Sequence, residues 1–363
     1  MRTLAIETSC DDTSLAVISN ESGFFVVEKI MAYTQTEEHK KRWWVVPELA
    51  ARAHADKILT VLESLHIDRS TIDTISVTAF PGLPGALVVG VTTAYTLGSL
   101  YNKPVVEVHH IMWHIFSVLV ERSLADIQFP YVCLTVSGGH NDLYLIESHQ
   151  WSVISDQKLM SNDWWLMTKS KLNHVNIWES MIVWPYSVTK LWQTIDDASW
   201  ECFDKVARML WWPYPWWKWI GEQAIQYDLW SHTERTWSFN AAKLPDQPFN
   251  FSFSGIKWQI HQLVSRGEID PGNPDDINAV AFHFQEAVTD VLVDKLAKAV
   301  QKFWAKTVGV VWWVSANLRL REKIAAHPVL SKTNLLFPTQ FVYCTDNAAM
   351  IGVVGLMDGE EEK

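Results

Sequence analysis

The chain has 363 residues, of which 48% are hydrophobic and 20% charged, and its formal net charge is −11. This composition is typical of a globular protein with room for two lobes, and it excludes a disordered or membrane-embedded chain. The acidic balance argues against a protein that holds nucleic acid alone through a broad basic face, but it leaves open a local patch or a partner that presents the nucleic acid.

The N-terminus, MRTLAIETSC, lacks an apolar signal region with a small-residue cleavage site. We therefore expect a cytoplasmic protein. The most apolar stretch, residues 86–100, is short and contains Gly and Thr, which predicts a buried helix and no membrane span. The four cysteines are scattered without a CxxC pair, so we expect them to be reduced.

Short apolar strands alternate with helices along the chain. The pattern predicts strands at 2–8, 14–19, 24–30, 75–79, 105–108, 131–136, 142–147 and 308–311, and helices at 47–65 and 86–100. A further helix is expected to begin at Ser315, a good N-cap residue. The opening three-strand meander and the strand pair near 131–147 predict a mixed α/β protein of two similar lobes, with a ligand cleft between them.

Two histidines carry the first chemical signal. His110 and His114 are four residues apart, so on a helix both imidazoles project from one face and can share a metal ion. Alone, such a pair is more often a pair of ordinary polar helix residues. The zinc-protease pattern His-Glu-x-x-His is absent, because no glutamate lies between them, which disfavours peptide hydrolysis. Asp346, just before a predicted helix, is either its N-cap or a third ligand.

Two turns offer further candidates. Residues 135–140, TVSGGH, run from a strand into a glycine turn, where backbone N–H groups can approach a phosphate, although an ordinary hairpin turn fits equally well. Asp11 and Asp12 lie in the first turn. They either orient a phosphate-bound metal or polarise a nucleophile, or are plain turn aspartates.

In their order along the chain these segments resemble one family. The blocks are ETSCDDTSLAV at 7–17, VVPELAARAH at 45–54, PGLPGALVVG at 81–90, HHIMWH at 109–114, VSGGHNDL at 136–143, IDDASWECFDKVARML at 195–210, FSFSGIK at 251–257, VSAN at 314–317 and CTDNAAMI at 344–351. They resemble the TsaD family, the bacterial tRNA threonylcarbamoyladenosine transferases. The resemblance extends from residue 1 to about residue 355, interrupted by one insertion.

The resemblance implies a two-lobed fold of the actin, sugar-kinase and Hsp70 type. It also implies transfer of the threonylcarbamoyl group of threonylcarbamoyl-AMP to N6 of the adenosine 3′ to the anticodon, in tRNAs that read codons beginning with A. The implied partners are tRNA, a smaller paralogous TsaB-like subunit and a P-loop ATPase of TsaE type, with no membrane. Two alternatives remain open: a catalytically inactive scaffold subunit of the same complex, and a kinase of the same fold.

The resemblance also assigns roles by position. Asp11 is the expected catalytic residue. The implied ligands of one divalent metal ion, iron in preference to zinc, are His110, His114 and Asp346. The implied contacts to threonylcarbamoyl-AMP or an ATP-like nucleotide are Thr135, Val136, Ser137, Gly138, Gly139, Asp204, Trp217 and Asn317.

The expected domains follow the same resemblance. The first lobe spans residues 1–108 and is completed by a C-terminal helix near 345–363. The second lobe spans 109–344. An insertion near 148–185 is polar and poorly periodic, which predicts a surface loop or a hairpin extension.

Tryptophan is abnormally frequent. It occurs 21 times against 15 glycines, whereas average usage gives roughly 25 glycines in a chain of this length. Where the family pattern has small residues, this chain has Trp43, Trp44, Trp113, Trp192, Trp200, Trp211, Trp216, Trp217, Trp312 and Trp313, and Trp212, Trp230 and Trp304 group with them.

Two explanations compete for these tryptophans. If they are real, indoles enter the nucleotide pocket and positive-φ positions are strained by about 1–3 kcal/mol each. Summed over ten or so sites, that exceeds a stability of about 5–15 kcal/mol. Alternatively, UGA codons that specify glycine in the source organism have been rendered as tryptophan. The second hypothesis accounts for both the tryptophan excess and the glycine deficit, and we favour it.

Overall fold

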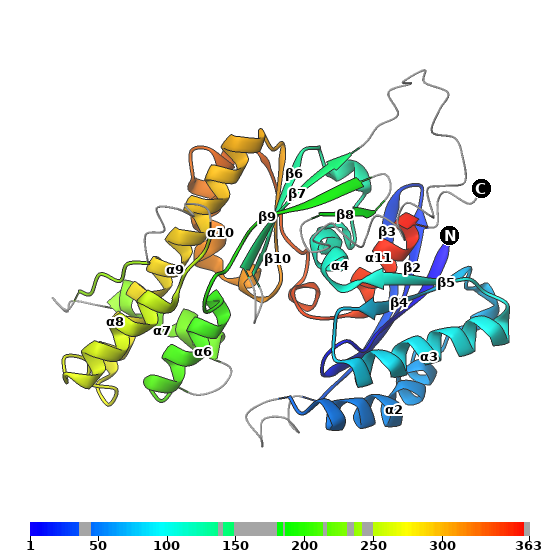
Figure 1. Ribbon diagram of the computed structural model, residues 1–363, viewed down its shortest axis with the longest axis horizontal. Helices are drawn as coiled ribbons and strands as arrows, with labels where there is room; N and C mark the ends of the chain where they lie inside the picture. The colour runs from blue at the N-terminus through cyan, green and yellow to red at the C-terminus, as the bar shows by residue number, and fades with distance from the viewer. Residues whose placement is uncertain are drawn as a thin grey trace, which may run out of the picture. The chain divides into compact units, whose positions relative to one another are not determined.

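The computed structural model describes residues 1–35, 45–136, 141–148, 180–183, 186–212, 216–230, 236–241 and 250–358. Contacts between residues divide the chain into two units (Figure 1). Unit 1 comprises Met1–Ile127, Gly309–Ala316 and Leu336–Lys363, and unit 2 comprises Gln128–Val308 and Asn317–Leu335. Within the described ranges, no helix combines the length and the apolarity needed to cross a bilayer.

Unit 1 is built on a five-stranded sheet. Its strand order is β3-β2-β1-β4-β5, and the strands are β1 (Arg2–Glu7), β2 (Asp12–Glu21), β3 (Phe24–Thr34), β4 (Thr74–Phe80) and β5 (Val105–His109). β3, β2 and β1 pair antiparallel, and β1, β4 and β5 pair parallel. The carboxyl ends of β1 and β5 therefore lie on the same edge of the sheet.

Helices cover both faces of this sheet. Side chains alternate between the two faces along each strand, and those on both faces of β1, β2 and β4 are mostly buried. Leu4 and Ile6 join a buried cluster with residues of α2 (Pro47–Ser64) and α3 (Pro84–Tyr101), which contact each other. On the other face, α11 (Ala348–Asp358) packs against β1, β2 and β4. Its two glycines allow this approach, since a Cβ at Gly355 would collide with Ser76 and one at Gly352 with Ile18.

Unit 2 contains most of a six-stranded sheet. The strand order is β11-β10-β6-β7-β9-β8, and the strands are β6 (Tyr131–Val136), β7 (Asn141–Ser148), β8 (Ser180–Val183), β9 (Tyr186–Gln193), β10 (Thr307–Val311) and β11 (Asn334–Leu336). β6, β7, β9 and β8 form antiparallel pairs. β6 is buried along its whole length, as expected of a strand inside the sheet.

The described helices of unit 2 are α6 (Ser199–Met209), α7 (Trp216–Trp230), α8 (Ser254–Ser265), α9 (Pro274–Phe303) and α10 (Leu318–Ala326). The 30-residue α9 contacts β6, β7, α7 and α10 (Figure 1). Pro274 at its first turn and the side chain of Asn273, which accepts a hydrogen bond from Asp275 N, fix where it begins.

The structure confirms the predicted α/β class and the predicted strands and helices to within a few residues. Three details differ. Asn317, not Ser315, caps the helix after β10, because Ser315 lies inside a 3₁₀ turn, Trp313–Ala316. Residues 86–100 form a helix that is buried on one face only, since Val88 and Leu100 are more than 60% exposed. Residues 109–127 group with unit 1, whereas the expected boundary placed them in the second lobe.

The predicted insertion begins at the end of β7 and is described only in part. Residues 149–179 and 184–185 lie outside the described residues. Ser180–Val183 form β8, which pairs with β9, so this end of the insertion belongs to the sheet.

Candidate metal centre

Three candidate ligands converge within unit 1. His110 and His114 lie one turn apart on α4 (His110–Phe116), which begins directly after β5. His109 starts this helix by accepting a hydrogen bond from Ile111 N at 3.1 Å. Asp346 precedes α11, and the ligand atoms of the three residues all lie within 4.8 Å of one another.

Asp346 is not the cap of α11. The Oδ1 of Asn347 accepts a hydrogen bond from Ala349 N at 3.0 Å and fills that role. The Oδ1 of Asp346 instead lies 3.4 Å from His114 Nε2, and neither atom has a hydrogen-bond partner among the described residues. Since buried polar atoms are nearly always paired, two orphaned atoms facing each other fit a metal ion that binds both.

Burial favours the uncharged form of all three candidate ligands. It lowers the pKa of His110 to about 3 and that of His114 well below its usual value, each with a further contribution from the neighbouring histidine. Burial, with the nearby carboxylates of Glu7, Asp11 and Asp12, raises the pKa of Asp346. Neutral imidazoles are the form that binds metal, and a divalent cation would supply the charge that favours the ionised carboxylate.

Ser9 orients the first histidine. Its side chain is 1% exposed, and its Oγ lies 3.1 Å from His110 Nδ1. With Nδ1 engaged in this way, Nε2 remains as the other ring nitrogen. Ser9 is itself held by Glu7, a buried carboxylate that accepts hydrogen bonds from Ser9 N and Thr78 Oγ1. Burial raises the pKa of Glu7.

The turn that carries Ser9, Asp11 and Asp12 is anchored from two other elements. Buried His54 of α2 bonds to Thr13 Oγ1 at 2.7 Å and to the Cys10 carbonyl at 3.0 Å. Gly82 brings the turn before α3 against the same segment, since a Cβ there would lie 2.7 Å from the Ser9 carbonyl oxygen. Burial, together with Asp11, raises the pKa of Asp12 to about 6.

Two indoles surround the histidines. The ring of Trp312 is stacked on His114 with centroids 3.3 Å apart and lies 5.5 Å from His110. Trp113, on α4 itself, has its ring centroid 3.7 Å from that of His114 and is fully buried. The Nε1 of Trp113 has no hydrogen-bond partner among the described residues.

The residues expected to bind nucleotide belong to unit 2 and are placed as follows. Thr135 and Val136 are buried at the end of β6, where Thr135 Oγ1 donates to the Asp142 carbonyl at 3.3 Å. Ser137, Gly138 and Gly139 lie outside the described residues. Trp217 lies in the first turn of α7.

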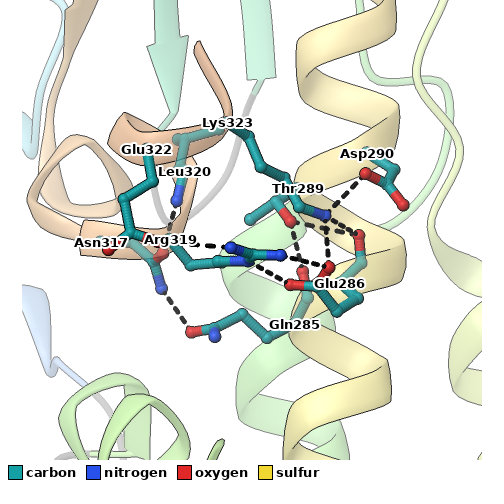
Figure 2. Close-up of polar contacts among 9 residues, drawn as sticks. All are labelled: Gln285, Glu286, Thr289, Asp290, Asn317, Arg319, Leu320, Glu322 and Lys323. Atoms are coloured by element: carbon teal, nitrogen blue, oxygen red, sulfur yellow. Dashed lines mark hydrogen bonds and ion pairs between the residues drawn. The ribbon is translucent and has the colours of Figure 1, made fainter. Parts of the chain in front are cut away.

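Asp204 and Asn317, two further expected nucleotide contacts, are engaged in internal contacts. Both oxygens of Asp204, on α6, bind the Arg208 guanidinium at 3.1 and 2.9 Å. Asn317 caps α10 by accepting from Leu320 N at 2.9 Å, and its Nδ2 donates to Gln285 of α9 at 2.8 Å (Figure 2). The structure thus gives Asn317 a structural role at the α9–α10 contact.

The same contact holds a group of charged side chains, shown in Figure 2. The Arg319 guanidinium binds both oxygens of Glu286, at 2.6 and 3.0 Å, and Lys323 bridges Glu286 and Asp290. These pairs fix α10 against α9, and so fix the position of Asn317.

Comparisons with known proteins agree on one family. A family model described as TsaD, tRNA N6-adenosine threonylcarbamoyltransferase, matches residues 27–162 and 180–353. The chain is 36% identical over 361 residues to the tRNA N6-adenosine threonylcarbamoyltransferase of Geotalea uraniireducens, with 98% of this chain and 90% of the relative aligned. The chain belongs to the TsaD family. The enzyme of that name from Bacillus subtilis is 34% identical over 369 residues, covering 99% of this chain and 91% of the relative.

Two solved structures of much lower sequence identity are similar to this chain in fold. HypF from T. kodakarensis matches with a TM-score of 0.50 and 12% identity, over 98% of this chain and 47% of the HypF chain. A full-length HypF in a phosphate- and nucleotide-bound form matches with a TM-score of 0.52 and 11% identity, over 100% of this chain and 56% of that one. At these identities the likeness concerns the fold alone.

Sequence reasoning missed three residues that position the centre: Glu7, Ser9 and His54. Each lies inside a block that resembles the family, but none has a distinctive spacing to a ligand. Ser9 and His110 are 101 residues apart in the chain, and only the pairing of β1 with β4 and of β4 with β5 brings them together.

Proposed function

We propose that this chain is a tRNA N6-adenosine threonylcarbamoyltransferase, with its metal ion bound by His110, His114 and Asp346. The observation that carries the proposal is the pair of orphaned atoms, His114 Nε2 and Asp346 Oδ1, in a chain that aligns with TsaD relatives over nearly its full length. A scaffold subunit would have no need of this donor set, and neither would a kinase of the same fold. Both alternatives are therefore disfavoured.

In the proposed reaction the N6 amine of adenosine attacks the carbamoyl carbonyl of threonylcarbamoyl-AMP. An N–C bond forms, the C–O bond to the phosphate breaks, and AMP leaves. His110, His114 and Asp346 would hold a divalent metal ion, which we propose to be iron in preference to zinc, and this ion would supply Lewis-acid stabilisation when bound. Asp11, beside the ligand Asp346 in the field of the acidic turn, takes up the proton that N6 releases.

The chain's own residues hold this arrangement in place. Ser9 orients His110, and Glu7 with His54 fixes the turn that carries Asp11. We propose that Thr135, Val136, Ser137, Gly138, Gly139, Asp204, Trp217 and Asn317 mark the region that binds the adenylate. For Asp204 and Asn317, exchange of their present partners, Arg208 and Gln285, would accompany binding.

We further propose that the protein works in the cytoplasm with tRNA, a TsaB-like subunit and a TsaE-like ATPase. Exposed apolar side chains on α2 and α3 support a protein partner there. Leu59, Val88 and Leu100 are each more than 60% exposed, and Tyr95 is 49% exposed. The free state of Cys10, Cys133, Cys202 and Cys344 supports a reducing compartment.

The test is a reconstitution with threonylcarbamoyl-AMP, partner subunits and tRNA transcripts, followed by mass spectrometry of the digested nucleosides. The chain, made with glycine at the tryptophan positions where the family pattern has small residues, should modify transcripts that read codons beginning with A and leave the same transcripts unmodified when their adenosine 3′ to the anticodon is replaced. Asp11→Asn should lower the rate at least 100-fold. Asp294→Asn, an exposed carboxylate on α9, is the matched control and should leave it unchanged. Equal rates for the two variants would contradict the role of Asp11.

A further inference from the structure

Left-handed backbone positions are enriched in tryptophan. Among the described residues, seven non-glycine residues have positive φ, and three of them are tryptophans: Trp211 at 60°, Trp304 at 54° and Trp312 at 75°. Tryptophan makes up about 6% of the chain, so fewer than one would be expected by chance. Bulky L-residues rarely adopt this region, whereas glycine does so freely.

Two of these tryptophans end helices in the position where glycine is usual. After α6, Trp211 N bonds to the Arg208 carbonyl at 3.3 Å and Trp212 N to the Ala207 carbonyl at 2.9 Å, which is the bonding pattern of a Schellman motif. After α9, Ala305 N and Trp304 N both bond to the Val300 carbonyl. The indoles make little contact, since Trp211 is 86% and Trp304 83% exposed.

Two other helices of this chain end in a left-handed residue of a type that is common at helix C-termini. α8 ends with Gly267 at φ 71°, with its N–H on the Val264 carbonyl and the next N–H on the Leu263 carbonyl. α3 ends with Asn102 at φ 52°, the usual alternative to glycine. Trp211 and Trp304 thus stand in the place that Gly267 and Asn102 occupy elsewhere.

At the metal centre the tryptophans conflict with the chemistry as well. Three protein ligands leave at least one coordination position for water or substrate. The ring centroid of Trp312 lies 3.3 Å from that of His114 and 5.5 Å from that of His110, so the indole occupies space directly against two of the three candidate ligands. Trp113 buries an indole N–H that has no partner in the part of the chain that the structure describes.

We propose that positions 113, 211, 304 and 312 are glycine in the protein made by its source organism, encoded by UGA codons that this organism reads as glycine. Glycine at 211, 304 and 312 suits the observed backbone without a Cβ conflict. Glycine at 113 and 312 removes both indoles from His114 and leaves room beside the ligand set for a phosphate-bearing ligand. Glycine at these positions fits the backbone whichever reaction the centre performs.

The decisive experiment is peptide mass mapping of the protein purified from its source organism, together with the coding DNA. The peptides that contain positions 113, 211, 304 and 312 should each be lighter by the difference between a tryptophan and a glycine residue, and each codon should be UGA. A tryptophan mass or a UGG codon at any of the four positions would overturn the proposal. Folding and activity do not enter this measurement, so it is independent of the proposed function.

The consequence for the metal centre is measured on the full-length recombinant chain. Zn²⁺ affinity, determined by competition with a chromophoric chelator, should rise at least tenfold in Trp312→Gly. Trp258→Gly is the matched control, because Trp258 is on α8 and 57% exposed; its Zn²⁺ affinity should not change. Equal Zn²⁺ affinities in the unsubstituted chain and in Trp312→Gly would refute the obstruction of the centre by the indole.

Discussion

Replacing Trp304 by Gly and by Ala isolates the energy of the left-handed backbone at the end of α9. Both variants lose the same indole, which is 83% exposed, so its few contacts cancel in the comparison. Only Ala keeps a Cβ at φ 54° and ψ 38°. A left-handed L-residue costs about 1–2 kcal/mol, and glycine loses roughly 0.5–1 kcal/mol more than Ala through its unfolded-state entropy. We therefore expect the glycine variant to be about 1 kcal/mol more stable than the alanine variant.

The same pair of substitutions at Trp258 supplies the control. Trp258 lies in the interior of α8 with an exposed side chain, where the backbone is right-handed helical. Here glycine should be about 1 kcal/mol less stable than alanine, because helix propensity now disfavours it. The two sites therefore differ by about 2 kcal/mol in the preference for glycine over alanine.

Urea unfolding followed by circular dichroism measures both pairs. With a slope of about 3 kcal/mol per molar urea, each 1 kcal/mol difference displaces the midpoint by about 0.3 M. The order of the midpoints should reverse between the two sites. If the alanine variant is as stable as the glycine variant at position 304, the left-handed conformation carries no cost there, and a positive φ does not disfavour tryptophan at this position.

Three further predictions concern the centre and the α9–α10 contact. Ser9→Ala should weaken metal binding about 10–100-fold by freeing the ring of His110, as measured by chelator competition. Burial raises the pKa of Asp12 to about 6, so Asp12 stays protonated to a higher pH in the folded state than in the unfolded state. The free energy of unfolding therefore falls as pH rises from about 4 to 6. Asp12→Asn should remove this loss and raise the free energy of unfolding by up to about 3 kcal/mol at pH 7.5 and by little at pH 4, as measured by urea unfolding. Glu286→Gln, which breaks the bidentate pair with Arg319, should cost about 1 kcal/mol in the same assay, since the guanidinium is partly exposed. An unchanged metal affinity, a pH-independent difference or an unchanged midpoint would contradict the respective prediction.

The local features of the fold follow from the sequence, because they depend on neighbouring residues. Short apolar segments predicted β1, β4 and β6, and Pro47 and Pro84 mark the first turns of α2 and α3. The spacing of His110 and His114 placed both on one helical face, since one helical turn separates them. The prediction that Ser315 caps α10 was wrong. A hydroxyl residue shortly before a helix is a possible N-cap, and the sequence does not show that a 3₁₀ turn lies between Ser315 and α10.

The sequence by itself determined the family, the α/β pattern, the histidine pair and the excess of tryptophan over glycine. Only the tertiary structure decided that Ser9 contacts His110, that Asn347 rather than Asp346 caps α11, and that Asn317 is engaged with Gln285. These outcomes depend on strand pairing and helix packing between distant segments, which composition and periodicity do not encode. The structure likewise showed which tryptophans have a left-handed backbone, because φ depends on the folded conformation and not on the residue type alone.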